Sequence, residues 1–322
     1  MKIFLKNYRI ILLFALLGFV TIMLVVFPDR YADTTFTGIK VWAFNVLPSL
    51  LPFFFITALM TGTGSLTKIT DKLSPVTRFL YRTGGISAYV QIMSFLSGYP
   101  VGVKIAADLY DRGVIDKYEV TKLSTFCSTS GPLFIVGSVG TAMFANKKAG
   151  IILLCAHLLS SVLCGVIFRF LPTGSDRPIS ADLTAKCDNV LYESIYSAVL
   201  SVAVVGGFIA VFFTFAAILS DVGVFIPIIK LLSPVVGEND ANGIAIGLIE
   251  CTFACRTFSA TLTPLSVSLA CGAISFGGLS VWCQSAVYLN KARADFKIFA
   301  FSKLTHTVLG FVICYVICMI FI

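Results

Sequence analysis

Charged residues are scarce in this chain. Asp, Glu, Lys and Arg together make up 12% of its 322 residues, whereas hydrophobic residues make up 57%. An ordinary soluble domain carries about 25% charged residues, so this chain lacks the charge needed to cover a water-exposed surface. The scarcity excludes a soluble enzyme and a disordered tail protein. The net charge of +8 comes from scattered residues rather than from a basic stripe, which excludes nucleic acid as a partner.

Sequence motifs for metal binding, nucleotide binding and catalysis are also missing. The sequence has two histidines, and most of its ten cysteines lie within apolar runs without the spacing of a zinc site. We therefore expect cysteines that pack as small hydrophobic groups, no disulfide framework and no metal ion. Because no Walker A loop is present, we expect no nucleotide or other cofactor. No paired aspartates and no nucleophile with a base occur in the apolar segments, so we expect that the protein is not an enzyme.

Long uncharged runs are what the chain has instead. A helix needs about 20 largely apolar residues to cross a bilayer. Candidate spans occur at nine places, one of them interrupted by a single acid: 10–27, 41–67, 83–103, 123–146, 149–168, 194–220, 241–255, 257–290 and 304–322. Polar backbone groups must be paired in lipid, so these segments are expected to be helices. The sequence predicts an all-α, polytopic membrane protein with about nine membrane segments.

The distribution of Lys and Arg predicts the orientation. The N-terminal tail carries Lys2, Lys6 and Arg9 without an acid, whereas the segment 172–193 carries more acids than bases. Cytoplasmic loops are enriched in Lys and Arg, so we expect a multi-pass protein of the cell membrane, in contact with lipid, with its N-terminus in the cytoplasm. The first apolar run is long for a signal peptide and lacks a clear cleavage site. Residues 1–30 are therefore predicted to form an uncleaved transmembrane helix.

An internal repeat follows the first helix. The segment Asp71–Pro75 (DKLSP) resembles Lys230–Pro234 (KLLSP), and the two histidines, His157 and His306, lie at matching places in the final apolar run of each half. We predict a duplication with one half at 40–171 and the other at 190–322. Paired halves with interrupted helices are typical of secondary transporters. Parallel and inverted repeats both remain open, as does assembly into a homo-oligomer.

Helix-breaking and polar residues gather in the central spans of both halves. Pro removes a backbone donor and Gly weakens a helix, so the segments 97–102 (SGYPVG) and 128–132 (STSGP) are predicted to interrupt their helices. Broken backbone at membrane depth is tolerated where it lines a protein cavity. The candidate residues for binding a substrate are Ser97, Gly98, Tyr99, Pro100, Lys104, Ser128, Thr129, Ser130, Gly131, Glu250, Arg256, Gly278, Ser280 and Gln284.

Charged residues within these spans suggest an anion site. A charge in the bilayer costs roughly 2.5–3.5 kcal/mol on insertion scales, so it is expected to pair with another group or with a substrate. Glu250 and Arg256 are six positions apart, which makes a direct pair within one helix unfavourable. We hypothesise that Lys104 and Arg256 line one central cavity and attract an anion. The alternative for Lys104 is an interfacial position beside Asp108.

The motifs in these spans resemble a known family. The segments 97–108 (SGYPVGVKIAAD), 130–137 (SGPLFIVG) and 277–284 (GGLSVWCQ) are similar to those of the sporulation integral membrane proteins of the YlbJ type. The resemblance runs from about Val41 to the C-terminus and leaves out the first helix. It implies two nucleoside-recognition, or gate, repeats related to those of concentrative nucleoside transporters, with broken or re-entrant helices.

The resemblance also implies a function. It points to a permease that moves a small anionic solute, dipicolinic acid, during endospore formation. The site positions that it implies are 97–100, 128–132, 277–280 and Gln284. Two alternatives stay open: a permease for a nucleoside-like solute, and a structural or assembly protein of the spore envelope that transports nothing. A scaffold would fill the central space with side chains, whereas a permease would keep a cavity there.

Overall fold

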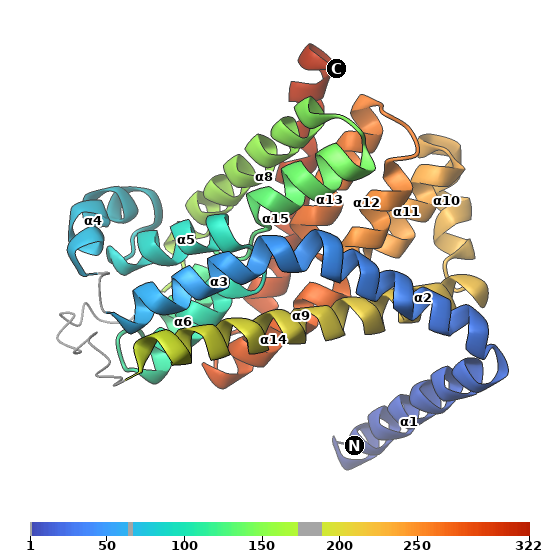
Figure 1. Ribbon diagram of the computed structural model, residues 1–322, viewed down its shortest axis with the longest axis horizontal. Coiled ribbons are helices and arrows are strands. Elements are labelled where there is room, and N and C mark those ends of the chain that lie inside the picture. The colour runs from blue at the N-terminus through green and yellow to red at the C-terminus, as the bar shows by residue number, and fades with distance from the viewer. Residues whose placement is uncertain (1, 64–66, 173–188) are drawn as a thin grey trace.

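The chain folds into helices. The computed structural model describes residues 2–63, 67–172 and 189–322, and these residues form helices and connecting turns without a β-strand (Figure 1). The prediction of an all-α, polytopic membrane protein is confirmed. Most of the predicted acidic segment 172–193 lies outside the described residues.

Two long helical tracts lie side by side along one face of the molecule. The helix α1 (Lys2–Val26) leads into α2 (Pro28–Val41) through a sharp bend of 105°. A π-helical turn, η1 (Trp42–Val46), then joins α2 to α3 (Leu47–Gly62). The 32-residue helix α9 (Val190–Asp221) packs along α2 and α3 (Figure 1). The indole N–H of Trp42 fastens the tracts by donating to the carbonyl oxygen of Val202 over 3.1 Å.

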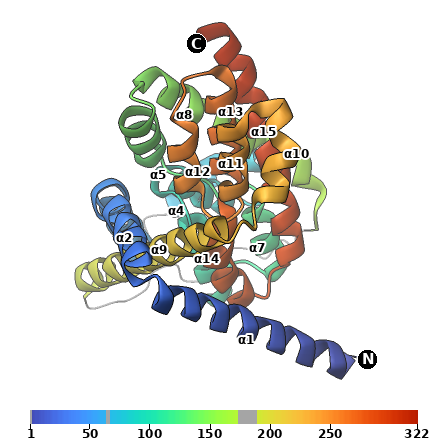
Figure 2. The same ribbon diagram turned by 90° about the vertical axis from the view of Figure 1, so that its right-hand side faces the viewer.

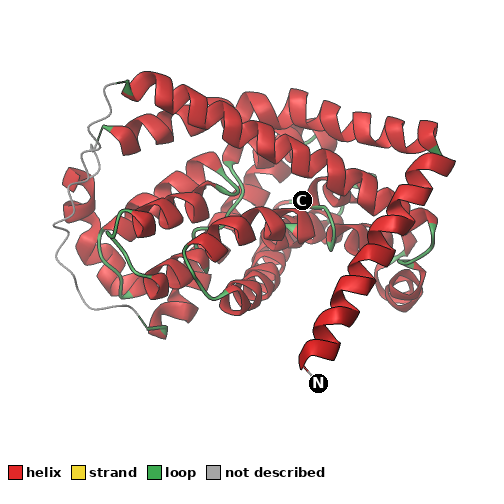
Figure 3. Cartoon of the chain, turned by 90° about the horizontal axis from the view of Figure 1, so that it is seen from below, coloured by secondary structure: helices red, strands yellow, loops and turns green. Residues whose placement is uncertain are grey.

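The first helix projects away from the bundle. Figure 3 shows α1 extending outward from its bend with α2, while the remaining helices cluster together. This agrees with the sequence, in which the first apolar run lies outside the predicted repeat. The bend follows from the start of α2, because Pro28 has a fixed φ and occupies the first helical turn.

Further helices, most of them short, follow each long tract. In the first half they are α4 (Thr67–Tyr81), α5 (Ile86–Ser97), α6 (Val101–Asp111), α7 (Lys117–Ser124), the π-helical segment η2 (Leu133–Met143), α8 (Lys147–Ile167) and the single 3₁₀ turn η3 (Phe168–Phe170). In the second half they are α10 (Ile226–Val236), α11 (Glu238–Gly247), α12 (Cys251–Phe258), α13 (Pro264–Phe276), α14 (Gly278–Lys291) and α15 (Phe296–Phe321).

The two sets run in the same order. Each begins with an amphipathic helix that contains a Leu-Ser-Pro sequence. Two helices separated by a short break follow, and a second break precedes the η2–α8 segments in the first half and the α14–α15 segments in the second. The breaks fall at 98–100 and 125–132 in the first half, and at 248–250 and Gly277 in the second. This order is what a duplication with halves at 40–171 and 190–322 would produce, and the duplication itself stays a prediction.

Fewer helices than predicted spans are long enough to cross a bilayer. Among the described residues, four helical stretches have the length and hydropathy for crossing, or five if the bent pair of α1 and α2 counts as one. Four shorter apolar segments accompany them: Leu50–Met60, Ile86–Ser97, Leu133–Met143 and Ile226–Val236. The expected count of about nine therefore mixes full spans with short, interrupted helices. The long run 257–290 is not one helix, because Gly277 separates α13 from α14.

Helices α8, α13 and α15 pack against one another and carry one of the buried apolar clusters (Figures 1 and 2). Large apolar side chains on the outer surface of α9 and α15 remain exposed, including Leu191, Ile195, Val199, Phe301, Val308 and Val312. An exposed apolar surface of this extent marks a membrane-facing region. The fold therefore places the polar residues of the central spans inside a shell that suits lipid.

Candidate functional site

The first broken pair of helices meets at two glycines. Helix α5 ends at Ser97, and Gly98 follows with a φ of 82°, which side-chain-bearing residues rarely adopt. A Cβ atom on Gly98 would lie 2.7 Å from the backbone nitrogen of Gly131, so only glycine permits the two interruptions to touch. A hydrogen bond also connects the two segments, because the hydroxyl of Ser94 donates to the carbonyl oxygen of Cys127 at 2.7 Å. Both interruptions predicted from the sequence are confirmed, and they lie against each other.

The second broken pair repeats this arrangement. The first turn of α14 donates two backbone hydrogen bonds to the break before α12: Leu279 N to Leu248 O at 2.9 Å, and Ser280 N to Ile249 O at 3.0 Å. A Cβ atom on Gly278 would lie 2.7 Å from the carbonyl oxygen of Ile249, so glycine is again required at the contact. In each half, therefore, the two breaks contact each other through their backbones.

Glu250 begins helix α12. Its carboxylate oxygen Oε2 accepts a hydrogen bond from the backbone N–H of Phe253 at 2.7 Å, and its side chain is 2% exposed. A carboxylate at a helix N-terminus satisfies a free backbone donor and is stabilised by the helix dipole. This contact balances part of the charge of Glu250 without a cation.

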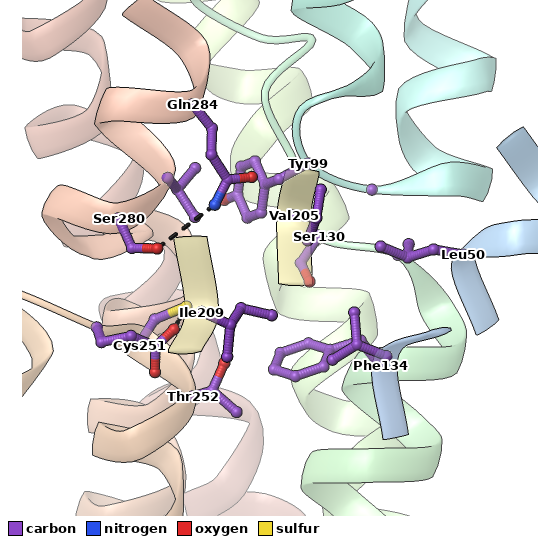
Figure 4. Close-up of a pocket in the computed structure, with 15 residues that line it drawn as sticks. Leu50, Tyr99, Ser130, Phe134, Val205, Ile209, Cys251, Thr252, Ser280 and Gln284 are labelled. Atoms are coloured by element: carbon purple, nitrogen blue, oxygen red, sulfur yellow. Dashed lines mark hydrogen bonds between the residues drawn. The ribbon is translucent and has the colours of Figure 1, made fainter. Parts of the chain in front are cut away.

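A small cavity with a mainly apolar lining and several polar groups lies between the two broken pairs. Its volume is about 60 Å³, measured as the space open to the centre of a water molecule. Figure 4 shows side chains from both halves pointing toward it: Leu50, Tyr99, Ser130 and Phe134 from the first half, and Val205, Ile209, Cys251, Thr252, Ser280 and Gln284 from the second. Gly98, Gly131 and Glu250 complete its polar wall. About 10–15 Å³ on this measure holds one water molecule, so the cavity can hold several.

One amide oxygen among the residues that line the cavity lacks a hydrogen-bond partner in the described part of the chain. The Nε2 atom of Gln284 lies 3.4 Å from Oγ of Ser280, and its buried Oε1 atom accepts no hydrogen bond from the described residues (Figure 4). Turning the amide over would free the nitrogen instead, so one polar end stays unsatisfied in either orientation. A buried polar atom without a partner costs about 1–3 kcal/mol. Because Gln284 lines the cavity, a rotation of its side chain would bring this oxygen to a bound molecule.

The remaining predicted residues of the breaks do not line the cavity. The hydroxyls of Ser97 and Thr57 lie 3.1 Å apart, and those of Thr129 and Ser94 lie 2.9 Å apart. Pro100 precedes α6, and its carbonyl oxygen accepts the first bond of that helix from Lys104 N. The hydroxyl of Ser128 is buried without a partner among the described residues, but it does not line the cavity.

The structure does not bring Lys104 and Arg256 to one cavity. The ammonium group of Lys104 donates to the hydroxyls of Ser197 and Ser201 on α9, at 3.1 and 2.8 Å. It lines a separate pocket with Asp108. Arg256 is exposed in the last turn of α12 and lines a third pocket with Asn45. The hypothesis that both cations line one central cavity does not match this structure, because α12 ends at Phe258 and leaves Arg256 at a helix end rather than in mid-span.

Lys303 is a buried cation that the sequence reasoning missed. Its side chain is 1% exposed, and its Nζ atom donates to Oη of Tyr99 at 3.0 Å and to the carbonyl oxygen of Ser128 at 2.9 Å. No carboxylate in the described part of the chain lies within 4.0 Å of it. In the sequence, Lys303 immediately precedes the last uncharged run and looks like its boundary. Its nearness to the histidine in the same helix was the available signal.

Metal binding finds no support among the described residues. The nine described cysteines are free thiols, and seven of them are buried. No group of three His, Cys, Asp or Glu side chains there could hold an ion.

Comparisons with known proteins give one relationship. No family model matches the chain, and no solved structure matches it. The sporulation integral membrane protein YlbJ of Bacillus subtilis (strain 168) is 28% identical to it over 319 residues, which covers 90% of this chain and 78% of YlbJ. The match therefore spans most of both halves. This similarity confirms the resemblance to the sporulation integral membrane proteins of the YlbJ type that the motifs indicate.

Proposed function

We propose that the protein is a multi-pass permease for a small anionic solute and that it acts in endospore formation. One observation carries the transport part: two pairs of interrupted helices, one from each half, lie on opposite sides of one cavity and contribute polar groups to its wall. Secondary transporters place their substrates between such repeats, at interrupted helices near the middle of the membrane. The role in sporulation is proposed because the relative YlbJ is a sporulation integral membrane protein.

The unpartnered amide of Gln284 supports a binding role rather than a packing role. A scaffold protein gains nothing from leaving a buried amide group unsatisfied, because an apolar residue in that place would avoid the cost. The hydroxyls of Ser130, Thr252 and Ser280 line the same cavity and offer further hydrogen bonds. This favours a permease over a structural or assembly protein of the spore envelope.

The charge around the cavity favours an anion. Helical segments η2 and α14 begin next to the cavity wall, at Leu133 and Gly278, and a helix N-terminus attracts negative charge. The ammonium of Lys303 lies directly behind Tyr99. The hydrogen bond from the N–H of Phe253 reduces the electrostatic repulsion between the carboxylate of Glu250 and an anion in the cavity. Dipicolinate, a small aromatic dicarboxylate, is the solute that we propose first.

A nucleoside-like solute is the second candidate. Glu250, Gln284 and Ser280 stand in one wall, and a carboxylate beside an amide and a hydroxyl can pair with the donors and acceptors of a sugar or base. We further propose that the protein transports its solute unchanged and catalyses no reaction. Membrane lipid and the solute are its proposed partners.

Uptake by the purified protein tests the proposal. Proteoliposomes would be supplied with radiolabelled dipicolinate or with radiolabelled uridine, and protein-free liposomes would give the background. Saturable uptake of dipicolinate that unlabelled dipicolinate suppresses and uridine does not is the expected result. Uptake of uridine alone would replace the anion with a nucleoside. Background uptake of both solutes would contradict a permease for either class.

A further inference from the structure

Lys303 reaches from the second half of the molecule into the broken helices of the first half. It stands on α15, while both of its acceptors belong to the first broken pair: Tyr99 follows the end of α5, and Ser128 follows the end of α7. The phenol of Tyr99 also contacts α13 in the second half, because its O–H donates to the carbonyl oxygen of Ile274 at 2.8 Å. The ammonium group of Lys303 therefore contacts both interruptions of the first half.

The surroundings of the ammonium are those of a cation site. Oη of Tyr99 must act as an acceptor toward Lys303, since its own proton goes to Ile274. The Tyr99 ring centroid lies 4.5 Å from Nζ, and a ring face attracts a cation. The third group, the Ser128 carbonyl, is also an acceptor. Each of these three contacts therefore presents negative charge density to the nitrogen.

Broken helices in transporters usually present such carbonyls to a free ion. Unwound backbone carbonyls and the C-terminal ends of half-helices coordinate the sodium ion or proton that drives transport. Here α5 and α7 both end just before the interruptions, and the negative ends of their dipoles favour a cation. We propose that the ammonium of Lys303 is a tethered cation that takes the place of a free monovalent cation between the first pair of broken helices.

The first half has no matching cation at the described position equivalent to Lys303. Aligning His157 with His306 places Lys303 opposite Leu154 of α8, a residue without charge. The second broken pair is instead closed by the direct backbone bonds from Leu279 and Ser280. One interruption is therefore held by a side-chain cation and the other by the backbone. A consequence, which rests on the proposed transport function, is that solute movement needs no sodium gradient.

The cation requirement can be measured on purified protein without any solute. Thermal unfolding would be followed in detergent with sodium chloride, propylammonium chloride or choline chloride at equal ionic strength. The variants are Lys303→Ala, which leaves a space the size of propylammonium, and Lys303→Met, which fills that space without charge. Lys297→Met is the matched control, because Lys297 is exposed on the same helix.

The expected pattern is specific. The wild type and Lys297→Met unfold at the same temperature in all three salts. Lys303→Ala loses about 5 °C or more in choline, since buried carbonyls lose their partner, and sodium or propylammonium restores at least half of the loss. Lys303→Met is destabilised but shows no restoration. Specific stabilisation of the wild type by sodium would overturn the proposal, and so would a Lys303→Ala variant that responds to neither cation.

Two further provisions keep the test decisive. Should Lys303→Ala fail to fold, the wild-type measurements decide alone: equal unfolding temperatures in sodium and choline support the tethered cation, and a rise in sodium overturns it. Uptake with and without a sodium gradient is measured separately. Absence of uptake would count against the proposed permease and would leave the cation result standing, so the two failures are distinguishable.

Discussion

The imidazole rings of His157 and His306 stack on each other, with centroids 4.8 Å apart and planes inclined by 30°. One histidine comes from α8 and the other from α15. The Nε2 atom of His157 accepts the backbone N–H of Ser130 at 2.9 Å, so this nitrogen carries no proton and Nδ1–H faces Ser275. His306 donates from Nε2 to the carbonyl oxygen of His157 at 3.1 Å. The pair therefore supports the interrupted segment behind the cavity.

Removing His157 should cost more stability than removing His306. His157→Leu leaves the buried N–H of Ser130 without an acceptor, which we expect to lower the free energy of unfolding by about 2–3 kcal/mol. His306→Leu frees a carbonyl that still accepts from the hydroxyl of Ser160, so a loss of about 1 kcal/mol is expected. Chemical unfolding of the two variants in the same detergent checks the order. Equal losses would mean that the bond to Ser130 is not the main contribution.

Gly98 should tolerate no side chain. Gly98→Ala places a Cβ atom 2.7 Å from the nitrogen of Gly131 in a backbone conformation with positive φ, and a loss of about 2–3 kcal/mol is expected. The control is Gly207→Ala, because Gly207 lies in helix α9 and a Cβ atom there would meet no described heavy atom within 4 Å. Alanine should stabilise that helix by up to about 1 kcal/mol. Similar effects of the two changes in thermal unfolding would argue against the close contact.

Labelling of Cys187 tests the predicted orientation. This cysteine lies in the acidic segment 172–193, which the sequence places outside the cell membrane when the N-terminus is cytoplasmic. A membrane-impermeant maleimide should label the wild type in intact cells, and Cys187→Ser should lose that label. Labelling that needs permeabilised cells would reverse the predicted orientation.

The breaks of the first half could be located from the sequence because their chemistry is local. Pro100 lacks a backbone donor and Gly98 weakens a helix, whereas the left-handed Gly277 that separates α13 from α14 lies in a run that was predicted as one span. These constraints act within a few residues and can be read without knowing the fold. The polar residues beside the breaks, including Ser130 and Gln284, could accordingly be assigned to the region that lines the cavity.

The partners of charged residues could not be read in this way. Lys104 meets serines of α9, and Lys303 meets residues more than 170 positions away, so both contacts depend on how the halves pack. Arg256 lies in a run of residues with apolar neighbours, but the early end of α12 puts it on the surface. The number of full spans failed to follow from hydropathy for the same reason, since helix length is set by the breaks and not by the length of an uncharged run.

Uptake by the Gln284→Leu variant tests the central claim most directly, because Gln284 offers the cavity its unpartnered amide. The account predicts that the rate of dipicolinate uptake into proteoliposomes falls about 10-fold, as expected for one lost hydrogen bond of roughly 1.4 kcal/mol, with the amount of folded protein unchanged. Arg256→Gln, on the exposed end of α12, should keep the wild-type rate. Wild-type uptake by Gln284→Leu, or loss of uptake in Arg256→Gln alone, would contradict a binding site between the two broken pairs.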